Sequence, residues 1–431
     1  MAQMLPNSRF VGIDLAPGAV RRGEELAAAA GLANVEIRCA DLQEVDAGSF
    51  DYIVAHGVYS WIAPEARQAL LSLCRRSLNP HGIAFVSYNA YPGSYMREMA
   101  REVLRFHLSD VDEPGAQLQA AHELMRTIVE MEATSPYAKV MREQMKRMLA
   151  FSDPHLFHDD LAEFNTAFYF HEFVAQAAAE GLRFLGEADL FESRMREVPA
   201  SAVRLMESLG EDEVVREQYL DFFKNRTFRQ TLLCHAEAPV ERVLDAGVVP
   251  RFAISAVIAL EDDGETYVGP AGVSVTTSEP HVRVVLEALA GAWPVALDFA
   301  ALAALATSAA GAEVPAEIVH ARLRTVLLEA YLSQVVQLHG APPPVSAEPG
   351  ERPLASPLAR AQCERGDAVV SSLLYANTRL DGELESQLLP LLDGTRDRDD
   401  LAAATGCARA ELDGVLKLFA LRGLLQPVDG S

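Results

Sequence analysis

Short apolar runs that alternate with helical segments over about the first ninety residues constrain the fold more than any other feature of this sequence. A proline opens each helical segment, at residues 17–31 and 64–78, and a glycine follows the first, as is common at helix ends. Strands alternating with helices imply a parallel sheet, so the sequence predicts an α/β fold. The runs expected to be strands are residues 9–13, Val35–Cys39, Phe50–Ala55 and residues 83–88, the last after a turn at residues 79–82.

Residues 95–164 have an almost purely helical pattern, with Met, Leu and Val spaced between charged residues. This segment is too long for a connecting loop, so we expect a helical lid inserted into the sheet domain. A helix at residues 170–180 follows it. Two later apolar runs, residues 181–188 and Phe228–His235, are expected to complete the sheet as an antiparallel edge pair.

The carboxy-terminal part contains two stretches of one design, residues 281–305 and 384–406, each followed by a longer third helix. Those third helices are expected at residues 316–337 and Arg409–Leu421. The pattern predicts two winged-helix-like modules, joined by an extended Pro- and Glu-containing linker at residues 340–353. The predicted domains are a Rossmann-like core (1–94), a lid and regulatory region (95–240), a first winged-helix-like module (241–340) and a second (341–431).

The net charge of −24 argues against nucleic acid and against an anionic membrane surface as partners, since both require clustered Lys and Arg. The acidic third helices of the winged-helix-like modules also argue against DNA binding, and we expect these modules to pack against other protein modules. The five cysteines are scattered, without a C-x-x-C pair, and no spacing of histidines suggests a metal site. With no secretion signal and no membrane-length apolar run, we expect a cytoplasmic protein with reduced thiols.

Acidic residues follow the first two predicted strands, at the sheet edge where α/β proteins bind ligands. Asp14 is expected to accept hydrogen bonds from the ribose hydroxyls of a nucleoside, although it could instead cap the next helix. Asp41 is expected to accept from the adenine amino group, with a surface turn as the alternative. Leu15 and Leu42 would provide apolar contacts to the adenine, and Leu42 would also offer its backbone amide. Leu15 could instead be a residue of the core.

The third strand ends in the segment His56–Trp61, in which a His, a Tyr and a Trp are crowded together. Aromatic faces hold alkylammonium or sulfonium groups, and His56 could accept a proton near neutral pH. Tyr59 and Trp61 could equally anchor the following helix in the core. Tyr88, with Asn89 after it, offers a second wall at the end of the fourth strand, and Glu172 is a further group able to take a proton.

Several of these segments together resemble a known group. The stretches FVGIDLAPGAV, CADLQEV, FDYIVAHGVYSWI and NPHGIAFVSYNAYPG resemble class I S-adenosylmethionine (SAM) dependent methyltransferases that carry a methyltransferase regulatory domain. The stretches FNTAFYFHEFVAQAAAEGLRFLGEA and FFKNRTFRQTLLCH resemble the regulatory domain itself. GPAGVSVTTSEP and LLDGTRDRDDL are similar to the winged-helix tail of bacterial protein-lysine methyltransferases that modify outer-membrane proteins.

The resemblance implies SAM as cofactor and a lysine amine of a protein as methyl acceptor. It places Asp14 at the ribose, Asp41 at the adenine, and His56 with Gly57 at the methionine half, with His56, Tyr59 and Tyr88 as candidates for catalysis. The acidic charge suits a basic, lysine-rich protein substrate.

Members of this family begin with a strand and a glycine-rich loop, and nothing before Asn7 matches it. We therefore expect a sheet without its first strand, either in a truncated copy or in a chain that folds around the gap. The absent motif favours an alternative function, a catalytically impaired binding or regulatory module. A nicotinamide-dependent enzyme is a third possibility, but it needs the glycine-rich motif as well.

Overall fold

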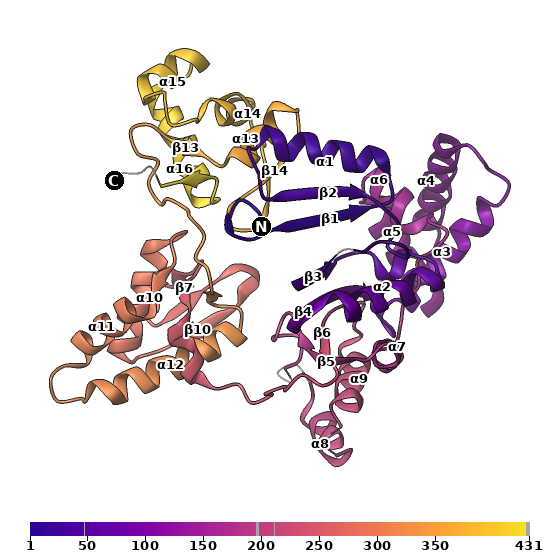
Figure 1. The fold of residues 1–431 in the computed structure, drawn as a ribbon, viewed down its shortest axis with the longest axis horizontal. Helices are drawn as coiled ribbons and strands as arrows, with labels where there is room; N and C mark the ends of the chain where they lie inside the picture. The colour runs from indigo at the N-terminus through magenta and orange to yellow at the C-terminus, as the bar shows by residue number, and fades with distance from the viewer. Residues whose placement is uncertain (47, 195–197, 211, 428–431) are drawn as a thin grey trace. The chain divides into compact units, whose positions relative to one another are not determined.

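The computed structural model describes residues 1–46, 48–194, 198–210 and 212–427 (Figure 1). The chain folds into two compact units. The first unit consists of Met1–Asp41 with Arg242–Ser431, and the second unit of Leu42–Glu241. Both units combine helices with strands and have their own apolar cores, so the predicted α/β class is confirmed.

The amino-terminal part of the first unit is a strand-helix-strand motif. Strands β1 (Phe10–Asp14) and β2 (Val35–Cys39) pair in parallel, with Asp14 opposite Cys39. Helix α1 (Pro17–Ala29) joins them and ends before Gly31, whose φ of 68° is the left-handed conformation that glycine adopts at low cost. The two-stranded sheet and its helix can be followed in Figure 1.

The rest of the first unit contains two small modules with separate cores, as the repeated sequence design predicts. Three helices pack around the first core, in which Leu286, Leu302 and Leu323 are fully buried. The third helix ends at Leu332, earlier than the predicted residue 337, because Gln334 has a positive φ of 60° and Gln337 belongs to a strand. The elements of this module are η3 (Ala246–Arg251), β7 (Ala253–Ser255), β8 (Ala259–Leu260), β9 (Thr266–Val268), η4 (Pro270–Gly272), β10 (Ser274–Thr276), α10 (Pro280–Ala292), β11 (Leu297–Asp298), α11 (Phe299–Ala310), α12 (Ala316–Leu332) and β12 (Gln337–His339).

The second module has a core of leucines around Phe419. Its third helix spans Arg409–Leu421, as predicted. Asp397 caps the preceding helix by accepting the backbone N–H groups of Asp399 and Asp400, which fixes where that helix starts. The elements are β13 (Leu354–Ala355), α13 (Pro357–Glu364), β14 (Val369–Ser371), β15 (Asn377–Arg379), α14 (Glu383–Leu388), η5 (Leu389–Leu391), α15 (Arg398–Thr405), α16 (Arg409–Leu421) and β16 (Leu425–Gln426).

The second unit is built on a four-stranded sheet in the order β3-β4-β6-β5. Strands β3 (Phe50–Ala55) and β4 (Leu78–Asn89) are parallel, whereas β6 (Phe228–His235) runs antiparallel to β4 and to β5 (Leu182–Glu187). The predicted antiparallel pair is therefore confirmed. The predicted turn at residues 79–82 is wrong, because these residues belong to β4 and form an irregularity in its pairing with β3.

Helices α2 (Pro64–Ser77) and α7 (Phe170–Ala179) pack with the sheet of the second unit into one apolar core. Each fully buried aliphatic side chain in such a core contributes about 1.5–3 kcal/mol. A short 3₁₀ turn, η1 (Tyr59–Trp61), connects β3 to α2. The core residues include Ala55, Leu71, Cys74, Val86, Phe173, Ala177 and Leu233.

The predicted helical lid is present in the second unit as a separate bundle with a methionine-rich core. Met125 and Met145 are completely buried in it. Two more helices, α8 (Ala200–Ser208) and α9 (Glu213–Lys224), precede β6. The elements of the lid are α3 (Tyr95–His107), α4 (Pro114–Glu130), α5 (Pro136–Leu149), α6 (Asp153–His155) and the π-helix η2 (Leu156–Asp160).

Within the ranges that the structure describes, no helix is both long and apolar enough to cross a membrane. Those ranges also contain no group of His, Cys, Asp and Glu side chains arranged to hold a metal ion.

Candidate functional site

The two carboxylates predicted to bind a nucleoside lie after neighbouring strand ends in the first unit. Asp14 is the last residue of β1, and its backbone carbonyl accepts the N–H of Ala40 at 3.1 Å. This hydrogen bond holds the loop that contains Asp41 close to Asp14. Asp14 does not cap α1, because Ala16 occupies the N-cap position. One Asp14 carboxylate oxygen accepts the Ala16 N–H at 2.8 Å, and in the described chain no group donates to the other.

The leucines beside these carboxylates differ in exposure. Leu15 is 70% exposed, so it is not the core residue that the sequence left as an alternative. Leu42 belongs to the second unit, where its side chain packs against the core under the sheet. Asp14, Leu15 and Asp41 are thus together in the first unit, and the remaining predicted site residues are in the second unit.

His56 and Gly57 directly follow β3 at the carboxyl end of the sheet in the second unit. The His56 ring stacks on Phe85 at 5.8 Å between centroids and meets Phe228 edge-on at 6.2 Å. Gly57 has a φ of 65°, and its N–H donates to Ser87 Oγ at 2.8 Å. The exposed imidazole is therefore positioned by neighbouring strands rather than by a flexible loop.

A cavity of about 370 Å³ opens next to this strand end. Gly57 and Trp61 form one side of it, and the π-helix η2 with the segment that follows it forms the other. Its size is that of a small-molecule site. The lining residues are Gly57, Trp61, His158, Asp159, Ala162, Glu163 and Phe164.

The far wall of this cavity is tied to β4 and to helix α3. Asn89, at the end of β4, donates to Asn165 Oδ1 at 2.7 Å, and Asn165 donates to the Asp159 carbonyl at 2.8 Å. Arg97 of α3 binds both carboxylate oxygens of the buried Asp160 at 2.7 and 3.0 Å. Arg101 of α3 donates to the carbonyls of residues 160 and 162 at 3.1 and 2.8 Å.

Tyr59 and Tyr88, the two predicted catalytic tyrosines, lie inside the core with 0% and 1% of their surface exposed. The Tyr59 hydroxyl donates to Gln176, and the Tyr88 hydroxyl is 3.2 Å from Thr231 Oγ1. Burial raises the pKa of both phenols, so both stay protonated at neutral pH. For Tyr59 this favours the anchoring role that the sequence left open.

A buried cluster of charges around Arg229 of β6 was not predicted from the sequence. Arg229, 1% exposed, binds Glu187 at 2.6 Å, Glu217 at 3.1 Å and Asp221 at 2.8 Å, and its guanidinium lies 3.9 Å from the centroid of Phe170. Arg226 contacts Asp221 as well, at 3.2 Å. The carboxylates come from β5 and α9 and Arg229 from β6, so no local pattern in the sequence could have indicated the cluster.

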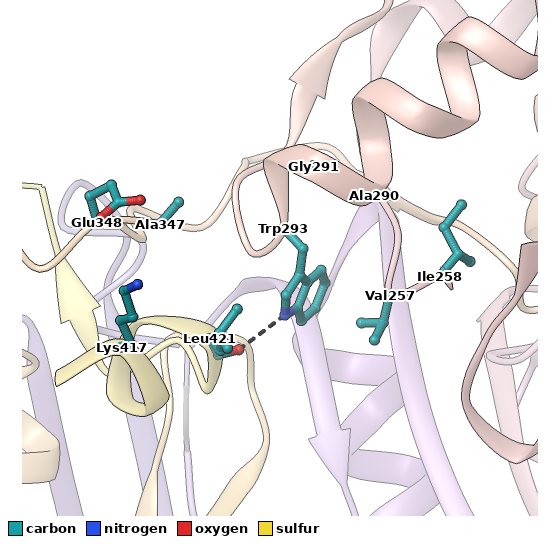
Figure 2. Close-up of a pocket in the computed structure, with 9 residues that line it drawn as sticks. All are labelled: Val257, Ile258, Ala290, Gly291, Trp293, Ala347, Glu348, Lys417 and Leu421. Carbon is teal, nitrogen blue, oxygen red and sulfur yellow. Dashed lines mark hydrogen bonds between the residues drawn. The ribbon is translucent and has the colours of Figure 1, made fainter. Parts of the chain in front are cut away.

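A second cavity, of about 340 Å³, lies between the two modules of the first unit (Figure 2). Trp293 stands between Leu421 and Val257, and its indole N–H donates to the Leu421 carbonyl at 3.0 Å. Lys417 and Glu348 lie on the Leu421 side. The contact joins the first module to the last helix of the second.

Three family models match the chain in the order of its parts. A methyltransferase domain matches residues 1–82, a predicted methyltransferase regulatory domain residues 152–235, and the C-terminal winged helix domain of PKMT residues 351–413. These matches give the chain a methyltransferase domain, a regulatory domain and a winged-helix domain, in that order.

Among curated proteins, the chain is 35% identical over 188 residues to the uncharacterized protein RP028 of Rickettsia prowazekii, covering 43% of this chain and 75% of the relative. It is 33% identical over 258 residues to RP789 of the same organism, covering 59% of this chain and 46% of the relative, so the chain spans about half the length of that protein. The structure of PKMT2 from Rickettsia typhi, also solved in complex with AdoHcy, matches with a TM-score of 0.85 and 26% identity, covering 98% of this chain and 90% of PKMT2. The chain belongs to the family of class I methyltransferases that carry a methyltransferase regulatory domain.

Proposed function

We propose that this protein is a SAM-dependent methyltransferase that transfers a methyl group to the side-chain amine of lysine in a protein substrate. The observation that carries the proposal is the cavity after β3, where Gly57 and Trp61 line a space of about 370 Å³ beside His56. The likeness over 98% of the chain to PKMT2, which has been solved with AdoHcy, supports the same function.

The residues after β1 and β2 fit the adenosine half of SAM. Asp14 is exposed and keeps one carboxylate oxygen available for ribose hydroxyls, and Leu15, 70% exposed, offers an apolar contact to the adenine. Asp41 is assigned to the adenine amino group, and Leu42 to an apolar contact with the base and a backbone hydrogen bond.

His56 and Gly57 are assigned to the methionine half of the cofactor, and His56 also to proton removal from the acceptor. When bound, SAM supplies an electrophilic methyl group on its sulfonium. A protonated amine has no lone pair, so the lysine must first lose a proton, and the exposed imidazole of His56 is a group that can accept it. We assign no proton transfer to Tyr59 or Tyr88, because burial keeps both phenols protonated.

A basic, lysine-rich protein is the acceptor that the net charge of −24 favours, since opposite charge speeds encounter and suppresses wrong partners. In the described chain no disulfide joins any of the five cysteines, which suits the reducing cytoplasm.

Calorimetric titration of SAM into the full chain tests the cofactor assignment. We expect a dissociation constant on the order of micromolar for the wild type, and binding weaker by about tenfold or more for Asp14→Asn. Asp262→Asn removes an equally exposed carboxylate far along the chain and should bind as the wild type does. If the wild type gives no heat and no thermal shift at millimolar SAM, the proposal fails and the regulatory alternative stands.

Methyl transfer is tested with labelled SAM and poly-L-lysine, with fully acetylated poly-L-lysine as the matched control. Label should enter only the free amine polymer, and His56→Ala should reduce its incorporation by about a hundredfold, the usual scale of a general base. Equal labelling of both polymers would show that lysine is not the acceptor.

A further inference from the structure

Three tyrosines form a surface aromatic cluster in the second unit: Tyr91, Tyr95 and Tyr169. The rings of Tyr91 and Tyr95 stack at 4.2 Å between centroids, and Tyr169 lies 5.2 Å from Tyr91 and 6.5 Å from Tyr95. The Tyr95 and Tyr169 hydroxyls are 3.1 Å apart. Tyr95 keeps 49% of its surface exposed, so the cluster is open to solvent on at least one side.

The surface aromatic cluster is held at the same edge of the sheet as the cavity, where the parallel strands β3 and β4 end. Tyr91 follows β4 by two residues, and its N–H donates to the Phe168 carbonyl at 3.0 Å. Tyr169 is the N-cap residue of α7 and Tyr95 the first residue of α3. Asn89, which ends β4, is bonded to the cavity wall through Asn165, so one segment of chain connects the two features.

Carboxylates accompany the rings. The Tyr91 hydroxyl donates to both oxygens of Glu98, at 2.7 and 2.9 Å, and burial raises the pKa of Glu98. Glu172 accepts the Tyr169 backbone N–H at 3.3 Å and is itself exposed. The hydrogen bond with Tyr169 raises the pKa of Tyr95 to about 12, so its ring stays neutral and its face electron-rich at neutral pH.

No arginine or lysine in the described part of the chain lies over these three rings. The cation–π contacts of the chain are made elsewhere, for example by Arg67 on Phe168 and Arg97 on Phe151. The ring faces are therefore available to a cation from another molecule.

We propose that the surface aromatic cluster, with Glu98 and Glu172, binds the ammonium group of a lysine side chain of the protein substrate. The aromatic faces attract the cation through their quadrupoles, and the carboxylates add a Coulombic attraction. This inference rests on the proposed function for the identity of the ligand, and it places the substrate-recognition surface next to the cavity in which the cofactor's methionine half would lie.

The test measures binding of an octalysine peptide to the full chain by calorimetry at about 0.15 M salt, where long-range attraction is screened. Tyr95→Leu removes the ring, Tyr95→Phe keeps it without the hydroxyl, and Tyr137→Leu is the matched control, since Tyr137 is 58% exposed on α5 of the same unit. We expect Tyr95→Leu to weaken binding about five- to tenfold and Tyr95→Phe to stay within about twofold of the wild type. Tyr137→Leu should bind as the wild type does.

Glu98→Gln provides a second variant that keeps all three rings, and it should weaken octalysine binding severalfold. Equal affinities of Tyr95→Leu and Tyr137→Leu would overturn the proposal, as would a wild type that does not bind octalysine. An equal loss in Tyr95→Leu and Tyr95→Phe would also overturn it, because the hydroxyl rather than the ring would then bind. SAM titrated in parallel separates the two proposals: if SAM does not bind but the Tyr95 pattern holds, the proposed function fails and the cation site remains.

Discussion

Two aromatic clusters in the second unit contain the same kinds of residue and differ in almost every other respect. In the interior cluster, Tyr88 stacks on Phe173 at 4.1 Å and Tyr59 meets Phe173 edge-on at 5.2 Å, and all three are at most 1% exposed. In the surface aromatic cluster, Tyr91 and Tyr95 stack at a similar distance, yet Tyr95 is half exposed. Along β4 the two clusters are separated by the strand end at Asn89, since Tyr88 lies inside the strand and Tyr91 two residues beyond it.

The largest difference should appear when a ring is removed from each cluster. Phe173→Ala is expected to lower the free energy of unfolding of the second unit by about 3–5 kcal/mol, because a fully buried ring leaves a cavity. In a Trp293→Phe background Trp61 is the only tryptophan, so its fluorescence during urea unfolding reports the second unit. Phe106→Ala, at an 85% exposed position, is the control and should change stability by less than about 0.5 kcal/mol.

The interior cluster is connected through one hydroxyl to the buried charge cluster around Arg229. Tyr88 contacts Thr231, which donates to Glu187, a partner of Arg229 in the buried charge cluster. Three carboxylates share two guanidinium groups there, and burial raises the pKa of Asp221 from 3.8 to about 6. The folded state therefore binds this proton more tightly than the unfolded state.

Stability from the Asp221 proton is fully present below about pH 4 and is lost as the pH rises through 6. The expected loss is on the order of 3 kcal/mol. Asp221→Asn mimics the protonated acid and should flatten this part of the pH profile, measured by urea unfolding of the Trp293→Phe background. An unchanged slope in the variant would show that another group is responsible.

A smaller effect is expected from one hydroxyl of the interior cluster. Tyr59→Phe removes the hydrogen bond to Gln176 but keeps the ring, so the free energy of unfolding should fall by about 0.5–1.5 kcal/mol. Methyl transfer to poly-L-lysine should be unchanged once the variant is folded. A loss of transfer in the folded variant would restore Tyr59 as a catalytic candidate.

The smallest effect on stability is expected at the surface aromatic cluster. Tyr95→Leu should change the free energy of unfolding by less than about 1 kcal/mol, since half of the ring is already in water. The same variant is the one expected to lose octalysine binding. A large destabilisation by Tyr95→Leu would mean that the surface aromatic cluster stabilises the fold as the interior cluster does.

Elements with a strong local pattern could be predicted from the sequence. The bounds of β2, β3 and β6 agree with their apolar runs, and the antiparallel pair of β5 and β6 was expected. The segment at residues 79–82 was misinterpreted because its Asn, Pro and Gly favour a turn, whereas tertiary pairing keeps it in β4. Between the pairs Phe50 with Leu78 and Tyr52 with residue 83, β3 advances by two residues and β4 by five (52 − 50 and 83 − 78), so the extra residues bulge out of the ladder.

The strand-end positions of the candidate residues were predictable from the sequence, whereas their burial was not. Strand-end rules located Asp14 and His56 where the structure has them, because such rules need only the order of elements. They could not separate the buried Tyr88 from Tyr91, nor find Arg229 and its three carboxylates, because burial and long-range pairing depend on contacts between distant elements.

The attachment of α3 to the cavity wall means that two ligands of the second unit should influence each other. Tyr95 and Glu98 share α3 with Arg97 and Arg101, which hold Asp160 and carbonyls of the cavity-lining segment. A ligand that orders this segment also immobilises the helix, so the entropy of ordering is lost only once when both sites fill. Occupancy of one site should therefore tighten the other reciprocally, with a coupling free energy of about 1–3 kcal/mol.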